Sequence, residues 1–91
     1  MTAARDTLKE ESLRRISYIE GHLKGIRKMV EEDQYCGDVM RQTLAVRKAI
    51  QKLEQLILEA HLRECVPAGI KAGNETKIVG ELVELYNLVE R

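Results

Sequence analysis

The chain is poor in aromatic residues and in proline. Its 91 residues include no phenylalanine, no tryptophan, three tyrosines and a single proline. The apolar 44% of the chain is therefore carried mainly by leucine, isoleucine, valine and alanine, which suit the seams between packed helices. The shortage of aromatic side chains also leaves almost no surface on which unpaired nucleic-acid bases could stack. We expect an all-α protein.

Long apolar runs are absent as well. No stretch of 18 apolar residues occurs, so we expect no membrane-spanning helix. The first ten residues lack the apolar segment of a signal peptide, and we expect a cytoplasmic protein. In a reducing compartment, two cysteines favour metal ligands or redox-active thiols over a structural disulfide.

The sequence also lacks the usual signs of an enzyme. It contains no Ser, His and Asp arrangement, no phosphate-binding loop and no paired carboxylate site. Its 15 basic and 15 acidic residues give a formal net charge of zero, so bulk electrostatics alone does not predict a nucleic-acid partner. We expect a protein that is not an enzyme.

The apolar pattern predicts three helices in a single domain that spans residues 1–91. We expect the first helix over residues 7–32, the second over 36–65 and the third over 75–90. The stretch V-P-A-G-I-K-A-G-N predicts a loop before the third helix, with Asn74 as its N-cap. A unit of this size has a limited interior, and the third helix is apolar on two adjoining faces. We therefore expect an oligomer larger than a dimer.

Cys36, His61 and Cys65 comprise both thiols and one of the two imidazoles of the chain. His61 and Cys65, four residues apart, share one face of a helix. Cys36 precedes His61 by roughly 38 Å along an uninterrupted helix, whereas the ligands of one ion lie within roughly 4 Å of one another. One helix cannot close such a site. We predict that two chains pair antiparallel, so that Cys36 of one chain meets His61 and Cys65 of the other.

Basic side chains gather on the first two predicted helices. Residues 14–29 contain five bases and one acid, and residues 39–53 contain four bases and no acid. Such a distribution suits a duplex backbone, although a solvated helix face is the simpler explanation of charge alone. The predicted DNA contacts are Arg14, Arg15, Arg41, Arg47, Lys48 and Lys52.

Three motifs together resemble the CsoR-like copper-sensing repressors. They are R-R-I-x-x-I-E-G-H-L-K-G-I on the first helix, a cysteine that opens the second helix, and H-x-x-x-C that closes it. The resemblance extends from about residue 14 to residue 89. It implies dimers of antiparallel helix pairs that join into tetramers and bind operator DNA without a helix-turn-helix. It also implies that copper(I) releases the DNA and derepresses copper efflux genes.

The resemblance assigns roles to particular residues. It implies that Cys36, His61 and Cys65 are the copper(I) ligands, and that Tyr35 and Glu81 link the metal to the third helix. The donor set agrees, because copper(I) prefers thiolates and accepts low coordination numbers. Structural zinc uses four ligands, and only three are offered here.

Four alternatives remain open at this stage. Within the same family, a nickel sensor can share these three ligands, and a persulfide or other thiol-redox sensor would use the two cysteines alone. In other classes, a metal carrier would bind no DNA, and a purely structural helical oligomer would bind neither metal nor DNA.

Overall fold

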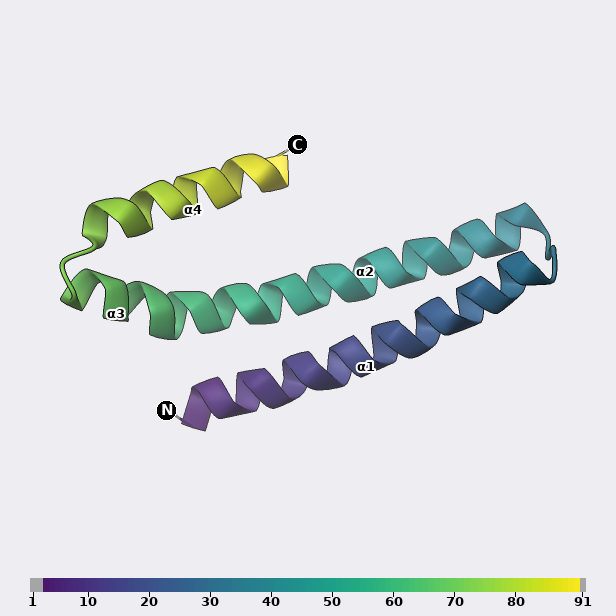
Figure 1. Cartoon of the computed structure of the whole chain (residues 1–91), viewed down its shortest axis with the longest axis horizontal. Coiled ribbons are helices and arrows are strands. Elements are labelled where there is room, and N and C mark those ends of the chain that lie inside the picture. The colour runs from purple at the N-terminus through teal and green to yellow at the C-terminus, as the bar shows by residue number, and fades with distance from the viewer. Residues whose placement is uncertain (1–2, 91) are drawn as a thin grey trace.

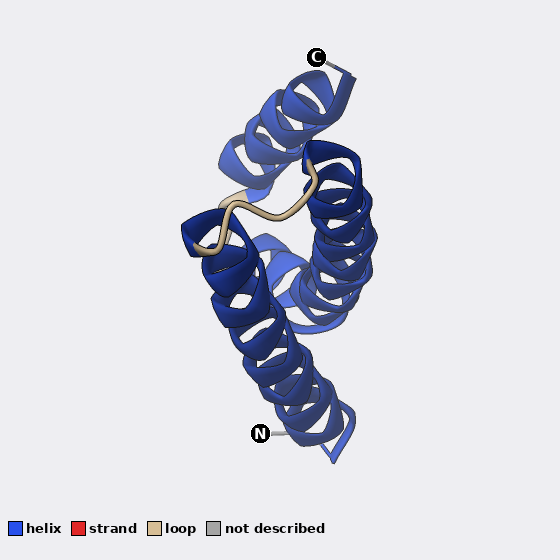
Figure 2. Cartoon of the chain, turned by 90° about the vertical axis from the view of Figure 1, so that its right-hand side faces the viewer, coloured by secondary structure: helices blue, strands red, loops and turns tan. Residues whose placement is uncertain are grey.

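The computed structural model describes residues 3–90, and side chains are described for residues 7–89. The chain runs through α1 (Ala3–Glu31), α2 (Cys36–Ala60), a π-helical turn η1 (His61–Cys65), α3 (Val66–Lys71) and α4 (Glu75–Glu90). No strand occurs among residues 3–90, which confirms the predicted all-α class (Figures 1 and 2). Within the same range, no helix has the length and apolarity needed to cross a membrane.

α1 and α2 form an antiparallel hairpin (Figure 1). α1 ends in a pair of hydrogen bonds, from the N–H of Gln34 to the carbonyl of Met29 (3.0 Å) and from the N–H of Asp33 to the carbonyl of Val30 (3.1 Å). Asp33 adopts a positive φ of 54°, the left-handed conformation that commonly ends a helix. This tight turn sets Cys36 at the start of α2, beside the end of α1.

A single chain buries little apolar surface. Among the described side chains only three are buried apolar residues, namely Leu8, Ile19 and Val46. Principal extents of 55, 31 and 15 Å describe a long, flat arrangement of helices. Much of the predicted apolar stripe therefore stays uncovered in one chain, including exposed Ile16, Leu23 and Val30 on α1 and Ile50 and Ile57 on α2.

The predicted loop between the second and third helices is mostly wrong. The helix continues from α2 through η1 into α3, and only residues 72–74 separate α3 from α4. Pro67 lies in the first turn of α3, directly after the π turn. In the preceding π turn, the N–H of Val66 bonds to the carbonyl of His61, five residues back. Proline thus reshapes this helix without ending it.

Glycine, not proline, ends α3. Gly73 has a φ of +85°, and its N–H bonds to the carbonyl of Ile70 (3.0 Å) while the N–H of Asn74 bonds to the carbonyl of Gly69 (2.9 Å). These are the two hydrogen bonds of a Schellman motif. The N–H of Ile78 then bonds to the carbonyl of Asn74 (2.9 Å), so α4 begins directly after that residue. The side-chain cap expected from Asn74 stays a prediction.

The turn after α3 folds α4 back along α2, on the side away from α1 (Figure 1). α4 approaches α3 closely at Gly69. A Cβ on that glycine would lie 2.7 and 2.8 Å from Cγ1 and Cδ1 of Ile78, closer than carbon atoms pack. The absence of a side chain at Gly69 therefore permits the approach of α4.

Candidate metal centre

The imidazole and one thiol of the predicted triad lie within the single π turn. η1 begins at His61 and ends at Cys65, and π turns of this kind occur often at functional sites. The His61 side chain is 24% exposed, whereas Cys65 is an exposed free thiol. This half of the predicted site is supplied by one short stretch of chain.

Glu81 of α4 reaches the His61 ring from the opposite helix. Its Oε1 lies 2.9 Å from Nε2 of His61, an ion-pair distance. Nε2 is buried, and its alignment with the carboxylate does not meet hydrogen-bond geometry. Because Nε2 faces Glu81, Nδ1 is the ring nitrogen left for a metal. The structure thus brings together the two residues that the sequence analysis expected to be linked.

Cys36 and Tyr35 lie at the other end of α2 (Figure 1). Cys36 is an exposed free thiol, and the Tyr35 side chain is also exposed. A Cβ on Gly37 would lie 2.6 Å from Cε2 of Tyr35, so this ring rests against the first turn of α2 beside Cys36. In the described part of one chain, no group of three or more His, Cys, Asp or Glu side chains is placed to hold a metal ion. The two parts of the predicted site, here called half-sites, therefore lie apart within one chain.

Both half-sites point to the same side of α2. At 3.6 residues per turn, the interval from Cys36 to His61 leaves the two positions within about 20° of one another around the helix axis. Ile50 and Ile57 lie between them along the helix and within about 40° of the same direction; both are exposed. The face that bears these positions thus carries Ile50 and Ile57, together with the charged Arg47 and Glu54, between a candidate ligand position at each end. We call it the ligand face of α2.

The basic side chains predicted to contact DNA occupy a different face. Arg41, Lys48 and Lys52 are exposed and lie about 140° to 180° around α2 from His61. Arg41 pairs with Asp38 (2.7 Å), but both side chains are more than half exposed, and pairs of this kind are weak. Arg47 lies within about 40° of His61 instead, and so belongs to the ligand face.

α1 adds to this basic surface. Arg14 and Arg15 line a groove with Glu11 and Tyr18, and Ala49 closes the groove on α2. Around the axis of α2, Lys48 lies about 100° and Lys52 about 60° from Ala49, both in the same direction. We call the surface formed by Arg14, Arg15, Arg41, Lys48 and Lys52 the basic face.

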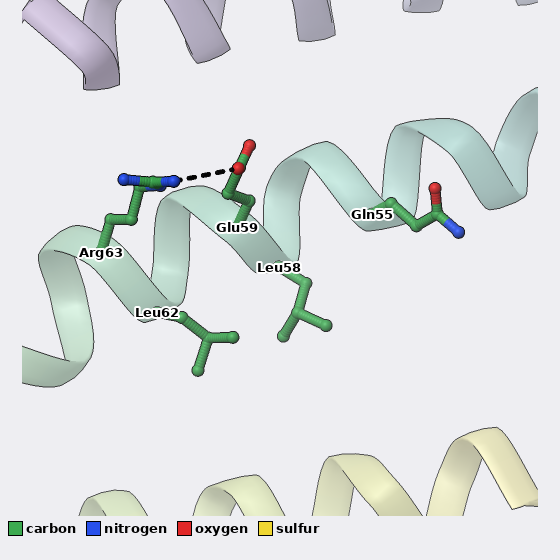
Figure 3. Close-up of a pocket in the computed structure, with 5 residues that line it drawn as sticks. All are labelled: Gln55, Leu58, Glu59, Leu62 and Arg63. Carbon is green, nitrogen blue, oxygen red and sulfur yellow. Dashed lines mark hydrogen bonds and ion pairs between the residues drawn. The ribbon is translucent and has the colours of Figure 1, made fainter.

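A second hollow lies on α2 and η1 and holds no candidate ligand. Figure 3 shows Leu58 and Leu62 pointing toward α4, while Arg63 pairs with Glu59 at 3.4 Å on the other side of the helix. Gln55 completes the lining. None of the five residues is a thiol or an imidazole, so this hollow is not part of a thiolate metal site.

Sequence reasoning missed the contribution of Gly69. Its neighbourhood to Pro67 was interpreted as a sign of a loop, whereas both residues lie in α3. The sequence did offer a signal, because Gly69 lies about one turn before Gly73, which ends the helix. A glycine inside a helix usually has a packing reason. Through Ile78, Gly69 sets how near α4, and with it Glu81, comes to His61.

Comparison with known proteins identifies the family. Residues 8–90 match the model of the family described as metal-sensitive transcriptional repressor. This chain belongs to that family. The resemblance stated from the sequence motifs is thereby confirmed, and the family is one of transcriptional repressors, not a class of enzymes.

Among relatives, the copper-sensing transcriptional repressor CsoR of Bacillus subtilis (strain 168) is 36% identical over 78 residues, which cover 86% of this chain and 77% of the relative. The protein of the same name from Mycobacterium tuberculosis (strain ATCC 25618 / H37Rv) is 34% identical over 76 residues, covering 84% of this chain and 64% of the relative. This chain therefore spans about two thirds of the length of the mycobacterial protein.

Two solved structures share the fold. The copper-sensing repressor CsoR with Cu(I) from Geobacillus thermodenitrificans NG80-2 superposes with a TM-score of 0.82 at 30% identity, over 90% of this chain and 85% of that one. The nickel-responsive transcriptional regulator InrS superposes with a TM-score of 0.68 at 36% identity, over 86% of this chain and 88% of that one. Sensors of two different metals thus share this arrangement of helices.

The contact at Gly69 yields a prediction about stability. Gly69→Ala should lower the free energy of unfolding by about 1 to 3 kcal/mol, because the added methyl group overpacks against Ile78. Gly80→Ala is the matched control, since a Cβ there meets nothing within 4 Å and alanine favours a helix interior. Urea unfolding at one fixed chain concentration measures both variants. In the Ile78→Ala background Gly69→Ala should cost less than in the parent, because the methyl group no longer meets the isoleucine. A neutral Gly69→Ala in the parent would contradict the close approach.

Proposed function

We propose that this chain is a copper(I)-responsive transcriptional repressor, which binds operator DNA without metal and releases it when copper(I) binds. The observation that carries the proposal is the ligand face of α2. Cys36 stands at one end of this face, and the His61–Cys65 turn stands at the other, with the imidazole backed by Glu81. Within one chain these positions are too far apart to hold one ion, whereas two paired chains can bring them together.

An antiparallel dimer follows from that face. Laying the ligand face of one α2 against its copy covers Ile50 and Ile57, which are exposed in a single chain. In the antiparallel orientation the same contact brings Cys36 of each chain to His61 and Cys65 of the other, so two equivalent sites form per dimer. Burying exposed isoleucine stabilises this pairing by the hydrophobic effect.

A tetramer is the proposed larger assembly. The chain itself covers only part of the apolar surface of α4, and six large apolar side chains of this helix stay exposed. These are Val79, Val83, Leu85, Tyr86, Leu88 and Val89. We propose that a second dimer packs against these residues, as the family resemblance implies. The assembly would act in the cytoplasm.

The donor set favours copper(I) over the other metals. Two thiolates and Nδ1 of His61 complete a three-coordinate site for a soft ion. Both thiols are exposed and free. The sequence contains no third cysteine, and its one other histidine, His22, contacts Gln42, so no fourth donor of this kind is offered to a structural zinc ion. The copper-sensing names of the relatives support the same choice. A nickel sensor is the second candidate, because the nickel-responsive InrS shares the fold.

The mechanism couples two faces that point in opposite directions. Binding to the duplex draws on contacts between the basic face and phosphates, with release of counterions. Cys36 of one chain and His61 and Cys65 of the other would hold copper(I), which would supply a soft centre that joins the two chains. Tyr35 accompanies Cys36 to this junction, and Glu81 holds the far side of the imidazole, so α4 shares any movement of His61.

Because the basic face lies opposite the ligand face on α2, the metal cannot displace DNA by direct contact. Release must come from a change in how the chains sit against each other, which alters the spacing of their basic faces. A coupling free energy of about 1 to 3 kcal/mol between two quaternary arrangements changes DNA affinity about 5- to 150-fold.

The proposed function is tested by DNA release under anaerobic conditions. The parent protein should bind duplex DNA enriched by it from a random-sequence library, and should release that DNA as copper(I) approaches one ion per chain. His61→Ala should bind the same duplex but no longer release it with copper(I). A thiol-redox sensor is indicated instead if persulfide treatment releases DNA from His61→Ala as well as from the parent. Absence of DNA binding at every salt concentration would leave only a carrier or a structural protein.

The role of Glu81 is separable from that of the ligands. Glu81→Gln should leave copper(I) affinity nearly unchanged, because the three donors are intact. Copper(I) should then reduce the DNA affinity of this variant little or not at all. Glu84→Gln on the same helix is the control and should behave as the parent. Competition with a copper(I) chelator measures metal affinity, and fluorescence anisotropy of labelled duplex measures release. Full release by Glu81→Gln would show that the contact between Glu81 and His61 does not transmit the signal.

A further inference from the structure

A polar cluster across the seam of α1 and α2 takes no part in the proposed metal site. Nε2 of His22 lies 2.6 Å from Oε1 of Gln42, which joins the two helices. Tyr18 meets the His22 ring edge to face, with ring centroids 5.8 Å apart and planes at 81°. Tyr18 and Gln42 are both exposed, and His22 is half-buried between the helices. The cluster is therefore accessible from solvent and internally ordered.

The cluster opens on the basic face. Tyr18 lines the groove that contains Arg14, Arg15 and Ala49. The basic residues of α2 lie on the same side of the hairpin as this groove. In an antiparallel pair, residues displaced in the same rotational direction from the contact line of each helix lie on the same side of the pair. Gln42 lies about 20° around α2 from Ala49 and about two turns before it, so it faces the seam at which this groove opens. Neutral hydrogen-bonding groups thus sit among the cations of this face.

The chemistry of Gln42 differs from that of its neighbours. Its amide oxygen is held at His22, so its NH₂ group keeps two donors in an exposed position. The surrounding arginines and lysines neutralise phosphates, which gives affinity that falls with salt and is largely independent of sequence. A glutamine amide with a fixed orientation can instead match the acceptors on the edge of a base in the major groove.

We propose that Gln42 is a sequence-reading contact of the basic face and that His22 is its positioning residue. This inference rests on the proposed DNA-binding function. The Tyr18 ring packs on His22 and so limits the movement of the imidazole that orients the amide. The cations hold the protein on any duplex, and Gln42 distinguishes the operator from other sequences.

The test compares Gln42→Ala with Lys48→Ala. Affinity is measured over a range of salt concentrations for the duplex enriched from a random library by the parent protein, and for a scrambled duplex of equal composition. Gln42→Ala should lose about 5- to 150-fold in affinity for the enriched duplex only, with the salt dependence unchanged. Lys48→Ala should weaken both duplexes alike and reduce the slope of log affinity against log salt by about 0.9 for each copy of Lys48 that contacts a phosphate.

His22→Ala should lower the ratio of the two affinities in the same direction as Gln42→Ala, but by less, because the amide remains present without its orientation. Thermal unfolding of each variant is the accompanying measurement. If Gln42→Ala weakens both duplexes equally, or changes neither, the amide reads no sequence and the inference is wrong. A parent protein that retains no duplex would overturn the proposed function, and this contact with it.

Discussion

The stiffness of α2, set against the short reach of a metal–ligand bond, is the constraint on which the rest of the structure depends. The helix separates Cys36 from His61 by roughly 38 Å, and bonds to sulfur or nitrogen span only about 2.0 to 2.3 Å. No rotamer of either side chain closes that gap. Under the proposed function the chain uses a second copy of itself to complete the site. Because only Leu8, Ile19 and Val46 are buried apolar residues among its described side chains, such association would also cover apolar surface.

The proposed metal ligands and the proposed DNA contacts consequently lie on opposite faces of one helix. Side chains at about 140° to 180° from each other cannot compete for the same space, so coupling must pass through the arrangement of the chains. α4 is well placed for this, because Glu81 contacts His61 while the rest of the helix keeps exposed apolar residues for a neighbour. Gly69 permits that placement through its close approach to Ile78, although it contributes no group to the site itself.

Helical periodicity predicted the elements well and their connection badly. The spans of α1, α2 and α4 follow from the apolar stripes, and the need for a second chain follows from the interval between Cys36 and His61. Pro67 and Gly69 suggested a loop, because both residues disfavour a helix interior. Local propensity does not reveal that the helix can continue past a proline after a π turn. The contact between Glu81 and His61 was implied by resemblance alone, since no spacing rule relates residues on helices that meet only after a turn.

A mixed-dimer experiment tests the central claim, that each site is shared between two chains. Cys36→Ala and Cys65→Ala chains are unfolded, mixed in equal amounts and refolded, and tight copper(I) binding is measured by anaerobic chelator competition. Neither variant alone should hold the ion tightly. The mixture should bind roughly one quarter of an ion per chain, because about half of its dimers pair unlike chains and each of these has one complete site. A mixture that binds no more tightly than the separate variants would contradict the shared site.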